Sequence, residues 1–327
     1  MTAAEPALRP DAAGLASPEW GGFDMDRTRG NGWTDVRHSF LTAVRLGWKM
    51  EANWTDPLLF VIYTVVKPIA SLLLLVMMIQ IIGAGATGAS DDTVRTFVVL
   101  GSALWAMLVA GIAGPAWSVL EDRERYRMLK YLYVSPATFL VLLVGRGGAR
   151  LAAGAMGTLV ALVFAVIVLG LRIDVATINW PLLLVSLVLG IVPILAIGVL
   201  LAAICLQTRQ ESWSYPDAFA GALFLVTGVV FPLAVLPDVL EVIGLINPVT
   251  WWVAGVRLAV TPDGPSSIGG EGSLWTAVTG SAAPDATTIV IALCVTGALA
   301  TLAATAIFRS SERHARELGL PDRTTGS

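Results

Sequence analysis

A dense run of charged side chains at residues 121–130 contains the residue types best suited to specific polar contacts in this chain. Each charged side chain would cost several kcal/mol inside lipid, so the run must lie in water, where it can contact a soluble partner. Seven of its ten residues are charged, and these are Glu121, Asp122, Arg123, Glu124, Arg125, Arg127 and Lys130. This run is the part of the sequence most informative about function.

No phosphate-binding loop accompanies it. The chain has three lysines, Lys49, Lys67 and Lys130, and none stands in the G-x-x-x-x-G-K-[ST] pattern that cradles nucleotide phosphates. The glycine-rich segment 145–148 lacks that lysine, and its small residues instead favour close helix packing. We therefore expect ATP and magnesium to bind elsewhere if this chain takes part in uphill transport.

Other catalytic chemistry is equally unsupported. The sequence presents no Ser/His/Asp, Cys/His or paired-carboxylate set, so we predict no catalytic residue. His38 and His314 stand alone, which predicts no metal site. Cys205 and Cys294 both fall inside apolar segments, where small buried hydrophobic residues are a better interpretation than a disulfide.

The composition identifies the environment of these residues. The 327 residues are 56% hydrophobic and 14% charged, whereas a soluble domain carries roughly 25% charged residues. The mean hydropathy is +0.75. Several apolar stretches are long enough to cross a hydrocarbon core of about 30 Å as helices. The sequence therefore predicts an all-α, polytopic membrane protein. Its net charge of −3 says little about partners, because basic residues concentrate on one side of the membrane.

We predict six transmembrane helices, near 58–82, 95–119, 140–171, 181–206, 217–236 and 286–308. Basic residues concentrate in alternate connections, and the positive-inside rule then places both termini and the charged run in the cytoplasm. The residues that decide this orientation are Arg27, Arg29, Arg37, Arg45 and Lys49, then Arg123, Arg125, Arg127, Lys130, Arg146 and Arg150, then Arg209, and finally Arg309, Arg313, Arg316 and Arg323.

Residues 237–260 test that count, because they are apolar enough to pass as a seventh span. A crossing there would put the arginine-rich C-terminal tail outside. A broken segment that dips into the membrane and returns fits better, since irregular backbone is tolerated at membrane depth where protein covers it. Pro232 and Pro237 interrupt helical hydrogen bonding and favour such a reversal.

The segments that flank the transmembrane domain, predicted at 57–308, have their own patterns. Residues 1–30 are rich in Ala, Pro, Gly and Asp, which predicts a disordered cytoplasmic tail. Residues 31–56 predict an amphipathic helix that lies in the membrane interface, with a short soluble helix packed on the charged run as the alternative. Residues 309–327 are predicted to form a second cytoplasmic tail.

The predicted spans offer little to an ion-coupled carrier, which needs ionisable groups near the bilayer midplane. No acidic residue lies well inside a span, and Asp217 is at an edge. Lys67, followed by Pro68, is the only charge deep in a span. Its long stem can carry the ammonium toward the interface; the alternative is an intramembrane contact with substrate or partner.

Two blocks of sequence resemble the membrane subunit of ABC-2 type exporters, a family that includes daunorubicin-type drug exporters and polysaccharide or O-antigen export permeases. The first block runs from Glu124 to Ser135-Pro136 and is followed by Gly145-Arg146. The second is Thr227-Gly228-Val229-Val230-Phe231-Pro232, then Leu236-Pro237 and Asn247-Pro248. With the order of the predicted helices, the resemblance covers roughly residues 33–308.

The resemblance implies a role for each block. The first would form a coupling helix that docks on an ATPase, and the residues concerned are Glu121, Glu124, Arg125, Arg127, Leu129, Ser135 and Pro136. The second would form a re-entrant hairpin near the exit of the transport path, with Phe231, Pro232, Pro237, Asn247, Pro248, Trp251 and Trp252. We expect the two tryptophans at the external interface, as a lid or as membrane anchors. Arg125-Tyr126-Arg127 replaces the family's small Gly-Thr step, which suggests a more acidic partner surface. A solvated loop without a partner is the alternative for the charged run.

The resemblance also implies the assembly: a homodimer of permeases in the bacterial plasma membrane, with two separate ABC ATPase subunits that bind ATP and magnesium. This chain would then be a transport subunit and not an enzyme, in contact with lipids and not with nucleic acid. The aliphatic spans, with Met77, Met78, Met107, Trp105 and Trp117, favour export of a hydrophobic or amphipathic drug, natural product or lipid-linked molecule. A polysaccharide or glycolipid exporter of the same fold is the alternative, and a self-sufficient channel or membrane enzyme is the alternative from another class.

Overall fold

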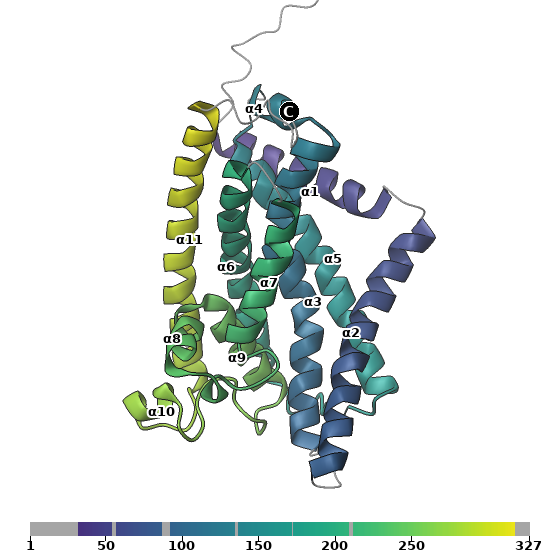
Figure 1. Ribbon diagram of the computed structural model, residues 1–327, viewed down its shortest axis with the longest axis vertical. Helices are drawn as coiled ribbons and strands as arrows, with labels where there is room; N and C mark the ends of the chain where they lie inside the picture. The colour runs from purple at the N-terminus through teal and green to yellow at the C-terminus, as the bar shows by residue number, and fades with distance from the viewer. Residues whose placement is uncertain are drawn as a thin grey trace, which may run out of the picture.

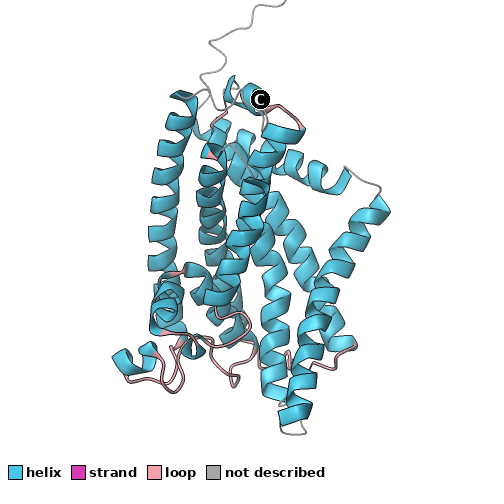
Figure 2. Ribbon diagram, in the orientation of Figure 1, coloured by secondary structure: helices cyan, strands magenta, loops and turns pink. Residues whose placement is uncertain are grey.

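The computed structural model describes residues 32–53, 57–86, 92–134, 137–171, 173–208 and 212–317. Within these ranges every regular element is helical (Figures 1 and 2). Five helices are long and apolar enough to cross a membrane. They are α2 (Pro57–Ala86), α3 (Asp92–Leu120), α5 (Phe139–Ile167), α6 (Trp180–Gln207) and α11 (Ala286–Glu317). The described residues thus confirm the all-α prediction, with several helices able to span a membrane.

The remaining helices are shorter and gather mainly at the two ends of this bundle. They are α1 (Gly32–Asn53), α4 (Leu129–Val134), α7 (Tyr215–Val226), α8 (Asp238–Ile246), α9 (Pro248–Val260) and α10 (Leu274–Thr279). Figure 1 shows α1, α4 and the last turns of α11 at one end, which we name the α4 end. It shows α8, α9 and α10 toward the opposite end, which we name the α9 end.

Two helices form the centre of the bundle. Buried residues make up 67% of the most apolar 18-residue stretch of α3 and 61% of that of α6. In α2 the corresponding share is 11%. The two central helices touch at backbone distance, since a Cβ at Gly198 would lie 2.8 Å from the carbonyl oxygens of Gly111 and Ile112. Helices α2, α5 and α11 cover this pair and leave their other faces exposed, as expected for surfaces in contact with lipid.

The fifth predicted span, at 217–236, differs from the observed structure. Helix α7 has only 12 residues, a length of about 18 Å, which is short of the roughly 30 Å needed to cross. It ends because Gly228 adopts a left-handed φ of 69°, and Pro232 further on lacks the N–H that a continued helix would use. Helices α8 and α9 together are long enough to cross, but they meet at an angle of 80°. Five helices are therefore span-like, or six if this bent pair is one span.

Helix α1 occupies most of the predicted 31–56 segment and runs across the α4 end (Figure 1). Small residues seat it on α5: a Cβ at Gly145 would lie 2.6 Å from Ala43, and one at Gly47 would lie 3.0 Å from Ala149. Trp33 and Phe40 remain exposed beside this contact. The middle of α1 is therefore fixed to the bundle, while an apolar part of its surface stays uncovered.

Helix α11 extends beyond the predicted boundary at residue 308 and ends at Glu317. Its far end packs on α6, because the Ser311 hydroxyl donates a 2.7 Å hydrogen bond to the Ala203 carbonyl. At its start, the Thr288 hydroxyl donates to the Asp285 carboxylate, and this bond lowers the pKa of that carboxyl.

The predicted tail at 1–30 lies outside the described residues, as does 318–327.

Candidate functional site

The charged run predicted to contact a partner forms a tight reversal at the end of α3, not a single helix. Residues Glu121–Arg125 make a π-helical turn, in which the Tyr126 amide donates to the Glu121 carbonyl at 2.8 Å. The Met128 amide then reaches back to the Asp122 carbonyl at 2.9 Å. Arg127 has a φ of 51°, a region that residues other than glycine rarely occupy. We name residues 121–128 the charged turn.

The first half of the charged turn faces inward and forms ion pairs. Arg146 on α5 donates to Asp122, whose side chain is 2% exposed. One turn further along α5, Arg150 donates from Nη2 to both carboxylate oxygens of Glu121 at 2.7 Å, and its Nε lies 3.5 Å from Glu51 on α1. These ion pairs join the charged turn to α5 and α1.

Arg123 ties the charged turn to a third helix. Its Nη1 donates to the carbonyls of Cys205 at 3.0 Å and Thr208 at 2.9 Å. These carbonyls belong to the last turn of α6, where a cation complements the helix dipole. The Arg123 Nε donates to Glu124 at 2.8 Å, so the predicted contact residue Glu124 is engaged within the turn.

The second half of the charged turn faces outward. Arg125, Tyr126 and Arg127 are exposed, and the Arg125 guanidinium lies 5.7 Å from the centre of the Tyr126 ring. Leu129, predicted as a contact residue, is instead 1% exposed and packs with the buried residues at the α4 end. Ser135 and Pro136 lie outside the described residues. Of the coupling residues predicted from sequence, Arg125 and Arg127 have exposed side chains.

The predicted exit-gate residues at the α9 end act as helix boundaries. Pro232 precedes the short turn Leu233–Val235, and Pro237 precedes α8. The Asn247 side chain accepts a 3.0 Å hydrogen bond from the Val249 amide, and Pro248 occupies the first position of α9. These caps produce the sharp bend between α8 and α9. Phe231 is half-buried in the segment before them.

Trp251 and Trp252 lie in the core, not at the external interface where we expected them. Trp251 is 4% exposed and donates from Nε1 to the Leu245 carbonyl at 2.7 Å. Trp252 is fully buried against α6, where a Cβ at Gly190 would lie 1.8 Å from its ring. Their buried positions provide packing between α9 and its neighbours, and they fit neither a surface lid nor a membrane anchor.

A buried arginine near these tryptophans was not singled out from the sequence. Arg257 on α9 donates from Nη1 to Gly228 O and Ser267 Oγ, each at 2.6 Å. Its Nη2 donates to Phe97 O at 3.1 Å and to Val229 O, and the guanidinium carbon lies 3.5 Å from the centre of the Phe97 ring. The sequence feature that could have indicated this residue is that it is the single arginine of a 13-residue apolar helix, where a charge is costly unless it has partners.

Lys67, the intramembrane charge predicted from the sequence, has an exposed position on α2. The Ser71 hydroxyl donates to its carbonyl oxygen at 3.0 Å. Within the described part of the chain, no ion pair involves the Lys67 ammonium. No three His, Cys, Asp or Glu side chains among the described residues are placed to hold a metal ion.

Comparison with known proteins adds no family. No protein-family model matches this chain, and no curated protein matches its sequence.

Proposed function

We propose that this chain is the permease subunit of an ATP-driven exporter of the ABC-2 type, and that a separate subunit binds and hydrolyses ATP. One observation carries the proposal: the tip of the charged turn exposes Arg125 and Arg127, while its base is tied to the transmembrane helices by buried ion pairs. A surface of this kind suits a soluble partner with acidic groups.

The base of the charged turn has the properties of a mechanical link. Its contacts reach α1, α5 and α6 through Glu51, Arg146, Arg150 and the carbonyl groups at the end of α6. Removing one member of a buried ion pair costs about 3–5 kcal/mol, because a charge is left without compensation. A displacement of the tip therefore moves three helices together in preference to breaking these contacts.

The assembly that follows from this proposal has two copies of the chain and two ATPase subunits in a bacterial plasma membrane. The α4 end would be cytoplasmic. The short helix α7 with the non-helical segment after it would serve as the sixth crossing, and α8 and α9 would form a re-entrant segment. The chain itself would carry no cofactor and no catalytic residue. ATP binding would close the two ATPases, and the charged turns would transmit this movement to the path between the permeases.

A hydrophobic or amphipathic cargo is the substrate class we favour. Met77 and Met78 are exposed on α2, whose apolar surface is the least covered of the span-like helices. Flexible thioether side chains accommodate varied apolar shapes. Lys67 lies exposed on the same helix, and it would meet an acidic group of such a cargo.

Co-purification from native membranes tests the subunit composition. Tagged protein, solubilised in a mild detergent, is expected to bring down a second polypeptide with a G-x-x-x-x-G-K-[ST] sequence, identified by mass spectrometry. Purified chain that conducts ions or turns over a substrate without any such subunit would instead favour a channel or a membrane enzyme.

Charge reversal tests the contact itself. Arg127→Glu is expected to lower substrate-stimulated ATPase activity by about tenfold or more, because like charges across an interface cost several kcal/mol. Arg309→Glu is the matched control, since Arg309 is also exposed but belongs to α11 and not to the charged turn. Equal activities of both variants in an intact complex would contradict the proposed contact.

A further inference from the structure

An apolar groove lies between α1 and α5 at the α4 end, where α1 crosses the bundle (Figure 1). Further along both helices, small residues close the contact, since a Cβ at Gly145 would lie 2.6 Å from Ala43. Toward the starts of the two helices the contact opens into the groove, which has a volume of about 340 Å³. Its α5 wall consists of Leu140, Val141 and Val144. None of the contacts described for the charged turn involves a residue of this groove.

One face of α1 forms the opposite wall of the groove. The residues that line it on this side are Trp33, Val36, Arg37 and Phe40. Because they are spaced by three, four and seven positions, they share one face of the helix. The three apolar residues of this set are exposed, and Trp33 is the most exposed at 81%. Both walls therefore offer uncovered apolar surface, which favours an apolar occupant.

Arg37 is the one charged residue among those described that line the groove. Its side chain is exposed, and within the described part of the chain it forms no hydrogen bond or ion pair. Residues 139–145 of α5 carry no charge. The other charged side chains of α1 are Asp35, Arg45, Lys49 and Glu51. Since Glu51 already pairs with Arg150, Asp35 alone opposes three cations of α1, and this side of the groove favours a negatively charged group.

The position and size of the groove indicate what fills it. Leu140 and Val141 lie in the first turn of α5, one of the span-like helices, so the groove is at an edge of the apolar layer, where tryptophan is favoured and phospholipids present both phosphate and acyl chain. A volume of about 340 Å³ is at the lower end of the range of about 300–1,000 Å³ for ligand pockets. Two helical turns, about 11 Å long, offer less surface than the roughly 800 Å² per partner that a stable protein interface buries.

We infer that this groove binds one acyl chain of an anionic phospholipid from the surrounding membrane, with the lipid phosphate next to Arg37. Arginine is well suited to phosphate because it stays charged and donates in a fixed geometry. The bound chain fills the space between α1 and α5 and supports the position of α1 across the α4 end. The lipid is a resident of the membrane and not the transported cargo. This inference concerns binding by the isolated chain, so it does not depend on an ATPase partner.

Native mass spectrometry of the delipidated, detergent-purified full chain tests the charge contact. The probes are dioleoyl phosphatidylglycerol, which is anionic, and dioleoyl phosphatidylcholine, which has the same acyl chains and no net charge. Phosphatidylglycerol is expected to bind about three- to fivefold more tightly, which corresponds to the contribution of one cation near an anionic membrane surface. Arg37→Gln is expected to bring the two affinities within about twofold of each other. Arg45→Gln is the matched control and is expected to keep the preference, since Arg45 is exposed on α1 but does not line the groove.

Filling the groove tests the acyl-chain contact. Val36→Trp places an indole ring in the groove and is expected to weaken binding of both lipids by at least about tenfold, because the ring takes the space of the acyl chain. Leu46→Trp is the matched control, since Leu46 is also exposed on α1 but does not line the groove. Equal lipid affinities of these two variants would overturn the inference, as would a wild-type chain that retains neither lipid. A lipid-free dimer that Val36→Trp dissociates would assign the groove to a second copy of the chain and would overturn it as well.

Discussion

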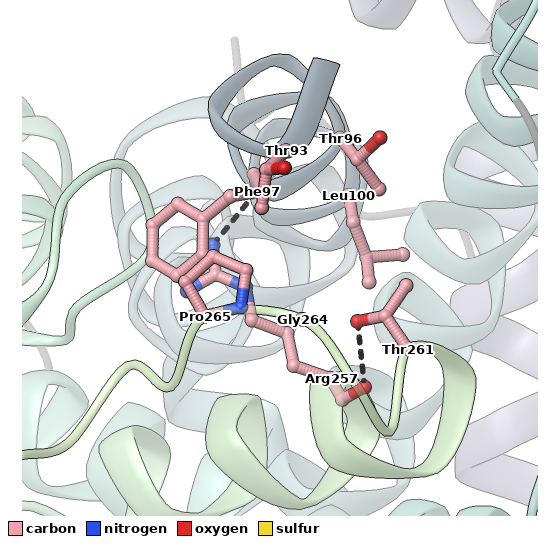
Figure 3. A pocket seen from close by; sticks show the side chains of 8 residues that line it. All are labelled: Thr93, Thr96, Phe97, Leu100, Arg257, Thr261, Gly264 and Pro265. Atoms are coloured by element: carbon pink, nitrogen blue, oxygen red, sulfur yellow. Dashed lines mark hydrogen bonds between the residues drawn. The ribbon is translucent and has the colours of Figure 1, made fainter. Parts of the chain in front are cut away.

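The two ends of the bundle bury arginine in different ways. At the α4 end, Arg146 and Arg150 meet the carboxylates of Asp122 and Glu121. At the α9 end, Arg257 meets only neutral oxygens and an aromatic face. Paired charges are satisfied within the protein and join helices to one another. Arg257 joins α9 to the first turns of α3 and to the segment after α7 through neutral acceptors (Figure 3). The first end is therefore held by ion pairs and the second by neutral hydrogen bonds.

The largest expected effect comes from breaking the paired end. Arg146→Met leaves Asp122 buried without a cation, which is expected to lower the free energy of unfolding by about 3–5 kcal/mol. Denaturant unfolding in detergent measures this loss. The double variant Asp122→Leu/Arg146→Met removes both charges and is expected to recover much of the stability. A double variant as unstable as the single one would show that the ion pair is not the cause.

A methyl group at Gly101 should break the other end. A Cβ there would lie 1.8 Å from the Val229 carbonyl oxygen and 2.2 Å from Nη2 of Arg257. Gly101→Ala is therefore expected to destabilise the protein by about 1–3 kcal/mol through overpacking. The matched control is Gly148→Ala on α5, because a Cβ at Gly148 meets nothing within 4 Å. That control is expected to be neutral or to gain about 0.5–1 kcal/mol, since alanine favours a helix interior.

The smallest effect on stability, with a clear effect on function, is expected at the tip of the charged turn. Arg127→Gly relieves a left-handed backbone at a φ of 51° and is expected to change stability by less than about 1 kcal/mol. The same variant removes an exposed cation and should reduce ATPase stimulation in the complex. Unfolding curves and ATPase assays on one preparation separate the two effects. Unchanged ATPase activity would assign Arg127 to turn geometry only.

The sequence predicts best those features that depend on long, local patterns. Apolar runs at 95–119 and 181–206 correctly indicate α3 and α6, because a membrane leaves the backbone few alternatives to a helix. The proline-rich stretch after residue 230 correctly indicates broken helices. It does not fix where α7 ends, since that depends on the left-handed conformation of Gly228.

Contacts between distant segments escape such patterns. In the sequence Arg146 lies 24 residues from Asp122, and Arg150 lies 29 residues from Glu121. The packing of α5 beside α3 brings these residues together. Both tryptophans of α9 resembled interfacial residues by type, and tertiary packing buries them. The contact between Arg257 and Phe97 joins residues that are 160 positions apart in the chain, so no local pattern predicts it. These residues decide how the candidate sites work.

The seating of Trp252 on Gly190 has a consequence for how this sequence can change over generations. A Cβ at position 190 would lie 1.8 Å from the indole ring, so a larger residue there requires a smaller one at position 252. Neither substitution is tolerated well alone, because one overfills the contact and the other leaves a void. The two positions should therefore vary together among homologous chains, and a library randomised at both should return paired solutions of small with large.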